Sequence, residues 1–448
     1  MTGPEFAHSK ELSGFSGLLH FAESPLGALE EARRLHGPLV YYRQPGSKVL
    51  LILDPPVIET LLVGEASKLV KDEFTRHLSH IVGQGLLTSE GELWKRQRKL
   101  LAPSFQPRQI AGFAEVMVER TLAMLAQFEE GQERDVHAEM MHLTLDVVVR
   151  TLFGSEIVRA NEVEHSLESI MADYRSLMMS WRAAFPPWFP FPARVRFKSK
   201  RKALRAIINE LIVERRKAPP GSDLLSTLIA ARDDEGRGMS DEQLLDEAMT
   251  VFLAGHETTA LSLAFTLFLL DQNQGVQAEL SAELDRVLAG AAPSYEDAQR
   301  LPYCTAVVRE AMRLYPPAWA MGREATQDFS LAGFPVARGT QLITAPWIVH
   351  RDERFFRDPA AFRPERWLNG ETNTLPRFAY FPFGGGPRVC IGNHFALLEA
   401  VLVLSTIVSR VRLERSEVTE LTLSPSVTLR PKGALPMRVT RRSVRQAA

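Results

Sequence analysis

The sequence predicts a mainly helical protein with a smaller β-rich part. Apolar residues recur at helical spacing in segments 108–129, 137–153, 161–180, 197–217, 241–272, 275–289 and 303–315. Strand-like apolar runs fall in residues 38–52, 329–348 and near the C-terminus. Because the strands come from both ends of the chain, we expect residues 1–448 to form a single domain.

Composition excludes several classes of protein. The 448 residues carry a net charge of −1, which gives the chain no overall attraction to nucleic acid or anionic membranes. The two cysteines, Cys304 and Cys390, provide no disulfide framework, as in cytoplasmic proteins. The N-terminus has no apolar signal core, and no run of about 18 apolar residues occurs. We therefore expect a cytoplasmic protein without a membrane anchor.

The most informative segment is Phe383-Gly-Gly-Gly-Pro-Arg-Val-Cys390-Ile-Gly392. An apolar run from Ile391 to Val411 follows at once and predicts a helix, whose N-terminus would lower the pKa of the Cys390 thiol. A thiolate is a soft metal ligand. A lone cysteine is usually a small buried apolar residue. Here, glycines that let the backbone approach a flat ligand and Arg388, which can pair with an anionic group, favour a ligand-binding role.

This segment resembles the haem-binding signature of the cytochrome P-450 family, and the resemblance extends from about residue 35 to the C-terminus. The soluble bacterial members are the most similar. The resemblance implies the cytochrome P-450 fold, with haem b between a long central helix and the helix after the cysteine. Cys390 would be the axial ligand of the haem iron, and Phe383, Gly384 and Gly392 would lie against the cofactor.

A second motif, Ala254-Gly-His-Glu-Thr-Thr259, lies in the middle of the segment that begins with the capping box Ser240-Asp-Glu-Gln243. Gly255 and the two threonines predict a loosened helical turn. By itself the motif also fits a kink with a satisfied buried acid. It resembles the family's oxygen-activation motif, most closely in the fatty-acid-hydroxylase-like branch. The resemblance implies catalytic roles for Thr258 and Glu257, with Ala254 and Gly255 beside the haem, whereas His256 is interpreted as structural.

The resemblance also implies a buried scaffold and four contacts to the haem propionates. Glu310 and Arg313, at i and i+3, would by themselves be common surface residues. The family pairs such residues with the arginine of a Pro-Glu-Arg-aromatic segment, here Arg366 in Pro364-Glu-Arg-Trp367. The residues expected at the propionates are Trp94, Arg98, Arg323 and Arg388.

Apolar residues are the candidates for the substrate pocket, although core packing explains each of them equally well. The candidates are Leu86, Leu87, Val251, Ala254, Ala318, Trp319 and Val427. Because no fixed charge occurs among them, we expect a lipophilic substrate, with fatty acids, steroids and terpenoids all open. Residues 177–192, rich in aromatics, Met and Pro, occupy the place of the family's mobile lid.

The sequence therefore predicts a haem-thiolate monooxygenase that inserts one oxygen atom from O₂ into a lipophilic substrate. The chain ends at Ala448 without room for a fused reductase, so we expect electrons from a ferredoxin or flavodoxin with its NAD(P)H reductase, and a monomer as the default. One alternative is a haem-thiolate isomerase, dehydratase or peroxygenase that needs no reductase. Another is a non-catalytic haem-binding sensor or carrier. The intact Glu257-Thr258 pair argues against both.

Overall fold

A computed structural model describes residues 21, 23–44, 47–154, 169–170, 173, 191–219, 221–415 and 421–442. Most of the predicted helix 161–180 and residues 177–190 of the predicted lid lie outside these ranges.

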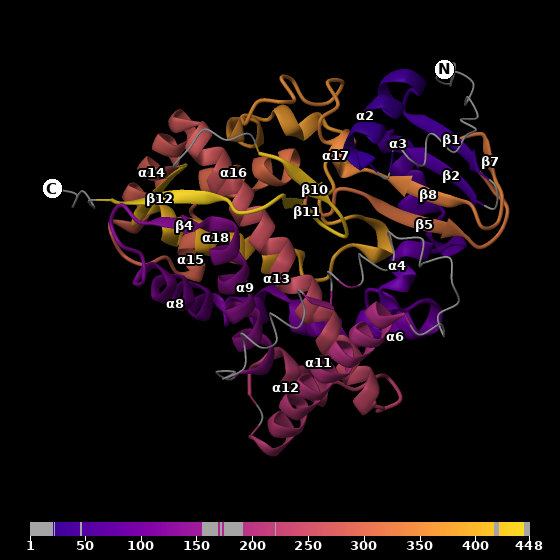
Figure 1. The fold of residues 1–448 in the computed structure, drawn as a ribbon, viewed down its shortest axis with the longest axis horizontal. Helices are drawn as coiled ribbons and strands as arrows, with labels where there is room; N and C mark the ends of the chain where they lie inside the picture. Colours follow the sequence, from indigo (N-terminus) through magenta and orange to yellow (C-terminus); the bar gives the residue numbers. More distant parts are fainter. Residues whose placement is uncertain are drawn as a thin grey trace.

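The described residues are mainly helical, as the apolar periodicity predicts (Figure 1). The predicted helix 108–129 is divided in two, since a turn at Gly112 and Phe113 separates α7 from α8. The α-helices are α2 Pro25–His36, α3 Pro55–Glu59, α4 Glu73–His77, α5 Ser79–Val82, α6 Gly91–Leu101, α7 Pro107–Ala111, α8 Ala114–Leu125, α9 Val136–Phe153, α11 Pro192–Lys217, α12 Leu224–Ala230, α13 Asp241–Gln272, α14 Gln274–Leu288, α15 Tyr295–Ala298, α16 Pro302–Leu314, α17 Pro346–Val349 and α18 Asn393–Val408.

The strands form small sheets that join distant parts of the chain. The largest sheet has the order β1-β2-β8-β5-β3, and its β2–β8 pair is parallel. A second sheet, β4-β12-β9, lies near the C-terminus, on the other side of the helices (Figure 1). The strands are β1 Leu39–Gln44, β2 Ser47–Ile52, β3 Leu69–Lys71, β4 Glu133–Asp135, β5 Met321–Ala325, β6 Phe329–Leu331, β7 Phe334–Val336, β8 Gln341–Thr344, β9 Val411–Arg415, β10 Leu423–Pro425, β11 Leu429–Pro431 and β12 Pro436–Arg441.

Helix α13 crosses the middle of the molecule (Figure 1). Its N-cap, Ser240, accepts a hydrogen bond from the Gln243 N–H, which is one half of the predicted capping box. The other half is not formed, because the Gln243 side-chain oxygen accepts from Arg96 instead. Among the described residues it is the one helix long and apolar enough to cross a bilayer, and 83% of its apolar window is buried inside the protein. A helix that is apolar on all sides is typical of a protein core.

The predicted loosening of α13 at Ala254–Thr259 is wrong, because the helix continues through this turn without a break. Gly255 instead permits close packing against α9. A Cβ atom at this position would lie 3.2 Å from Cγ2 of Val148. The glycine thus brings the two helices together, and their packing compensates for its low helix propensity.

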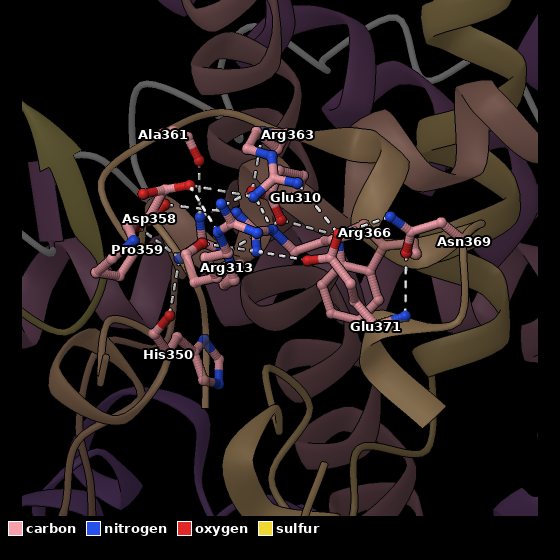
Figure 2. A network of polar contacts seen from close by, with 12 residues as sticks. Glu310, Arg313, His350, Asp358, Pro359, Ala361, Arg363, Arg366, Asn369 and Glu371 are labelled. Atoms are coloured by element: carbon pink, nitrogen blue, oxygen red, sulfur yellow. Dashed lines mark hydrogen bonds and ion pairs between the residues drawn. The ribbon is translucent and has the colours of Figure 1, made fainter. Parts of the chain in front are cut away.

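A buried charge network fixes α16 to the segment that follows α17 (Figure 2). Glu310 accepts hydrogen bonds from Arg313 at 2.8 and 2.9 Å, from Arg366 at 3.0 Å and from the Trp367 indole at 2.9 Å. Arg313 also donates to the carbonyl oxygens of His350, Pro359 and Ala361. The Glu310 and Arg313 side chains are completely buried, and Arg366 is 1% exposed. The two buried arginines therefore share the Glu310 carboxylate, and Arg366 also lies 3.7 Å from the partly exposed Glu371.

We expect Glu310→Ala to destabilise the protein by about 3–5 kcal/mol, because two buried arginines lose their shared anion. Urea unfolding measures this loss, and we expect little haem-loaded protein. The matched control is Glu371→Ala, since Glu371 lies at the partly exposed edge of the same network and should contribute less than about 1 kcal/mol. Equal effects of the two substitutions would contradict a scaffold role for Glu310.

Candidate active site

One cavity of about 400 Å³ collects most of the residues that the sequence singled out. It lies between α13, the segment around Cys390 and the start of α18, and its wall is mainly apolar. The predicted site residues that line it are Leu86, Leu87, Trp94, Arg98, Val251, Ala254, Gly255, Thr258, Ala318, Arg323, Phe383, Gly384, Arg388, Cys390 and Gly392.

The loop before α18 presents Cys390 to this cavity. The Cys390 N–H donates to the Phe383 carbonyl at 3.0 Å, which closes the glycine-rich turn. Gly386 has a φ of +65°, and a Cβ atom there would overlap the Leu62 carbonyl, so this position requires glycine. Gly392 is the N-cap of α18, and its N–H hydrogen-bonds to the Cys390 sulfur. The accessible surface of Cys390 faces the cavity.

The predicted lowering of the Cys390 pKa is wrong for the protein without a bound metal ion. Burial raises the pKa of this thiol above its ordinary value, and the Gly392 N–H, Arg98 and Lys71 offset part of the rise. The sequence motif around Cys390 does not show that the thiol is buried. A metal ion bound to the sulfur would reverse the balance, because a coordinated thiol is deprotonated outright.

Cationic side chains gather at one rim of the cavity. Arg98 donates to the Val389 carbonyl at 3.0 Å, which leaves part of its guanidinium toward the cavity. Arg388 packs 4.0 Å from the centre of the Trp94 ring and forms an ion pair with Glu90. Arg323 is 8% exposed, and burial lowers its pKa. The structure thus brings together all four residues expected at the propionates.

The α13 face toward the cavity carries Ala254, Gly255, Thr258 and Thr259. The Thr258 hydroxyl donates to the Ala254 carbonyl at 2.9 Å, the back-bonding that its position predicts. His256 points elsewhere: it is 2% exposed and its Nδ1 lies 2.8 Å from the Phe252 carbonyl. Its interpretation as a structural residue agrees with this placement.

Three predicted residues are not among those that line the cavity. Glu257 instead forms an ion pair with Arg430 at 2.6 Å and accepts a hydrogen bond from the Thr428 hydroxyl, both from the region of the β10–β11 hairpin. Trp319 is a core residue, 8% exposed, whose indole donates to the Ser426 carbonyl at 2.9 Å. Val427 packs against the same apolar cluster as Leu86 and Val251 but stays outside the cavity wall. The position of a residue in the sequence does not show whether its side chain faces the cavity or packs elsewhere in the core.

Comparison with known proteins gives the family. The cytochrome P450 family model matches residues 11–436. Cyclooctatin synthase from Streptomyces melanosporofaciens is 35% identical over 88% of this chain and 87% of its own length. Cyclooctat-9-en-7-ol 5-monooxygenase from the same organism is 35% identical over 84% and 83%, and pentalenene oxygenase from Streptomyces avermitilis is 31% identical over 88% and 87%.

The chain belongs to the cytochrome P450 family. It is therefore an oxidoreductase of the monooxygenase type that uses haem b, as the resemblance implied.

The residues of this cytochrome P450 fit haem. The cavity offers a thiol sulfur on one wall, apolar surface along its length and cations at the rim, which match the iron, the ring and the propionates of the cofactor. An electrostatic observation also points to an anion. Lys71 of β3 lies directly opposite Arg323 of β5 in the sheet, and both side chains line the cavity. Two like charges in this register destabilise a sheet unless an anion lies between them.

Lys71 is the site residue that the sequence did not reveal. Burial lowers its pKa to about 7, with further lowering by Arg323 and Arg388 and opposition from Glu90 and Asp72. The local sequence Leu69-Val-Lys71 does not indicate that Lys71 lies at the cavity. Lys71 is placed there by the pairing of β3 with β5, a strand about 250 residues later in the chain. We expect Lys71 to contact a propionate together with the three arginines.

A second unexpected group is Glu399 of α18, a completely buried carboxyl next to the cavity residue Ala400. Neither of its oxygens has a hydrogen-bond partner of good geometry within the described residues. Burial raises its pKa to about 8, and the Thr259 hydroxyl offsets part of the rise. The carboxyl is therefore mostly protonated at neutral pH.

We expect Lys71→Met to speed the transfer of haem to apomyoglobin by about tenfold, because a charge-assisted contact to the cofactor is lost. The apo-protein should keep its stability, since Lys71 then repels Arg323. Lys68→Met is the matched control, because Lys68 lies three residues earlier and pairs with Glu65 at the partly exposed surface. Equal haem loss in both variants would remove Lys71 from the haem site.

We expect Glu399→Gln to stabilise the protein increasingly as pH rises from 5 to 8. The folded pKa of about 8 lies above the ordinary value of 4.5, so the wild type loses stability over this interval as the unfolded chain ionises and the folded one does not. The difference should reach about 3–5 kcal/mol above pH 8. Urea midpoints of both proteins across this range measure it, and a constant difference would refute the assignment.

Proposed function

We propose that this cytochrome P450 inserts one oxygen atom from O₂ into a C–H bond of a cyclic terpenoid, with electrons from a separate redox partner. The observation that carries the proposal is that Cys390 and Thr258, from segments about 130 residues apart, line one largely apolar cavity. Haem held by the Cys390 thiolate would supply the activation of O₂, because a thiolate ligand donates electron density that favours O–O cleavage.

In this proposal the protein positions the reactants and delivers protons. Because its side chain faces the cavity, the Thr258 hydroxyl would be able to exchange its bond to the Ala254 carbonyl for one to a group in the cavity and to hold a proton there. Gly255 and Ala254 keep the space beside the hydroxyl free of larger side chains. The apolar wall would keep water away from the reacting groups.

In this proposal Glu257 supplies protons to this side of the cavity. Arg430 and the Thr428 hydroxyl both contact the Oε1 atom of its carboxylate. The position of the acid therefore depends on the region of the β10–β11 hairpin that carries these two partners.

The substrate class is inferred from the cavity and from the relatives. The names pentalenene and cyclooctat-9-en-7-ol describe cyclic, mainly hydrocarbon compounds, and the cavity of this chain is lined mainly by apolar side chains. Of the fatty acids, steroids and terpenoids that the sequence left open, we therefore favour terpenoids. We also infer a monomeric, cytoplasmic, single-domain protein that receives electrons from a ferredoxin or flavodoxin.

The first test is the spectrum of the reduced protein under carbon monoxide. A red-shifted Soret band of thiolate-ligated haem would support Cys390 as the ligand, whereas a band typical of histidine or thiol ligation would refute it. Titration of cyclic terpenoids, steroids and fatty acids into the oxidised protein then compares the substrate classes by the shift from low to high spin. Turnover that needs NAD(P)H and a redox partner would exclude an isomerase, a peroxygenase and a sensor.

We expect Thr258→Ala to bind haem and substrate normally but to form about tenfold less product per electron, with the remainder released as peroxide or water. A positioned proton donor contributes roughly 10²–10⁴-fold to a step of this kind. Thr266→Ala is the matched control, because Thr266 back-bonds to Ser262 on the same helix away from the cavity. Unchanged coupling in Thr258→Ala would remove this residue from the mechanism.

A further inference from the structure

The loop at residues 83–88 forms part of the cavity wall but has no regular secondary structure of its own. It carries Leu86 and Leu87, and two of its backbone amides bond to side chains of α13. The Gln84 N–H donates to Asp246 at 2.7 Å, and the Leu86 N–H donates to Glu247 at 2.9 Å. Two adjacent acids thus tie the loop to the central helix, and the Gln97 side chain of α6 also donates to the Gln84 carbonyl at 2.7 Å.

Two glycines allow the loop to lie directly on α13. Gly83 has a φ of +76°, and a Cβ atom there would overlap the Asp246 carboxylate. A Cβ atom at Gly85 would overlap the Thr250 hydroxyl and lie 2.6 Å from the Asp246 carbonyl oxygen. This close approach leaves no room for water between the loop amides and the two acids.

Asp246 also links a third element to this contact. Arg205 of α11 donates to its second oxygen at 2.6 Å, and the two side chains are 19% and 8% exposed. One carboxylate thus holds the loop at residues 83–88 and α11 at the same point of α13. Removal of Arg205 or of Asp246 would leave the other side chain mostly buried without its ion-pair partner.

Glu247 is difficult to explain as a core residue. It is completely buried, and its Oε1 has no hydrogen-bond partner in the described part of the chain. Burial raises its pKa to about 8, the Leu86 N–H opposes this rise, and Asp246 adds to it. A buried, half-satisfied acid destabilises a core relative to an apolar residue of the same size. Its one described hydrogen bond holds the backbone of a cavity residue.

We propose that Asp246 and Glu247 are positioning residues for the substrate: they fix Leu86 and Leu87 against α13 and thereby set the width of the cavity. Glu247 precedes the cavity residue Ala254 by about two helical turns, so the residue that holds the loop and a residue of the cavity wall belong to the same helix. A shift of the loop would change the space for a substrate without moving Cys390 or Thr258. The role in substrate choice rests on the proposed function, whereas the anchoring itself does not.

The test compares Glu247→Met, which removes the acceptor at similar size, with Glu247→Gln, which keeps it. Hydrogen exchange of the haem-loaded protein reports on residues 83–88 directly. We expect exchange in this loop to quicken by about tenfold in Glu247→Met, as for the loss of one buried hydrogen bond, and to change little in Glu247→Gln.

Spectral titration with imidazole and 4-phenylimidazole then measures the cavity. We expect the ratio of the two Kd values to change by about fivefold in Glu247→Met, because only the larger ligand reaches the loop. The Leu86→Ala background should abolish this change if Glu247 acts through Leu86. A merely structural residue would lower stability and leave the ratio unchanged.

Glu283→Met is the matched control, since Glu283 is also buried and accepts two backbone N–H bonds, from Tyr303 and Cys304, away from the cavity. It should lower stability while loop exchange and the Kd ratio stay as in the wild type. Unaltered exchange at residues 83–88 in Glu247→Met, or an unaltered Kd ratio with a loosened loop, would overturn the proposal. Neither measurement uses a substrate, so an error in the proposed function would leave both results intact.

Discussion

The site depends on the burial of most of α13. Because most side chains of this helix are buried, the polar ones among them need hydrogen-bond partners, either from other parts of the chain or from the helix itself. Asp246 and Glu247 bond to the loop at residues 83–88, Glu257 bonds to Arg430 and Thr428, and Thr258 bonds back to its own helix beside the cavity. Segments that are distant in sequence are thereby held against one helix, and these contacts fix the position of the cavity wall.

The charged side chains of the buried network and of the cavity rim fall into two groups. One group is paired within the protein core, and the other, at the cavity rim, contains more cations than anions. Glu310, Arg313 and Arg366 pair with one another in the core and are completed by backbone carbonyls and Glu371. At the cavity rim, Lys71, Arg98, Arg323 and Arg388 outnumber their acidic neighbours Glu90 and Asp72, and burial lowers the pKa values of these cations. A dianionic cofactor resolves that imbalance. Binding of haem and folding of this part of the protein are therefore coupled, since the cofactor binds only the folded arrangement.

Sequence reasoning was most successful where the signal is local. The capping box at Ser240 and the apolar periodicity placed α13 at Asp241–Gln272, the bounds that the sequence predicted. The cysteine motif and the Ala254–Thr259 motif located two walls of one cavity, because their residue types and spacing are specific. It was less successful with the pocket candidates Trp319 and Val427, which do not line the cavity, and no local pattern indicated the Arg430 and Thr428 partners of Glu257.

The sequence by itself determined the fold class and the family resemblance and singled out most of the candidate residues that line the cavity, since helical period, capping and short motifs are encoded by neighbours in the chain. Only the tertiary structure decided the environment of those residues. Burial raises the pKa of the Cys390 thiol, strand pairing places Lys71 opposite Arg323, and the packing of a loop on α13 gives Glu247 its one described hydrogen bond. The physical reason is that desolvation and charge pairing depend on what surrounds a side chain in space, and those surroundings are built from segments up to hundreds of residues away.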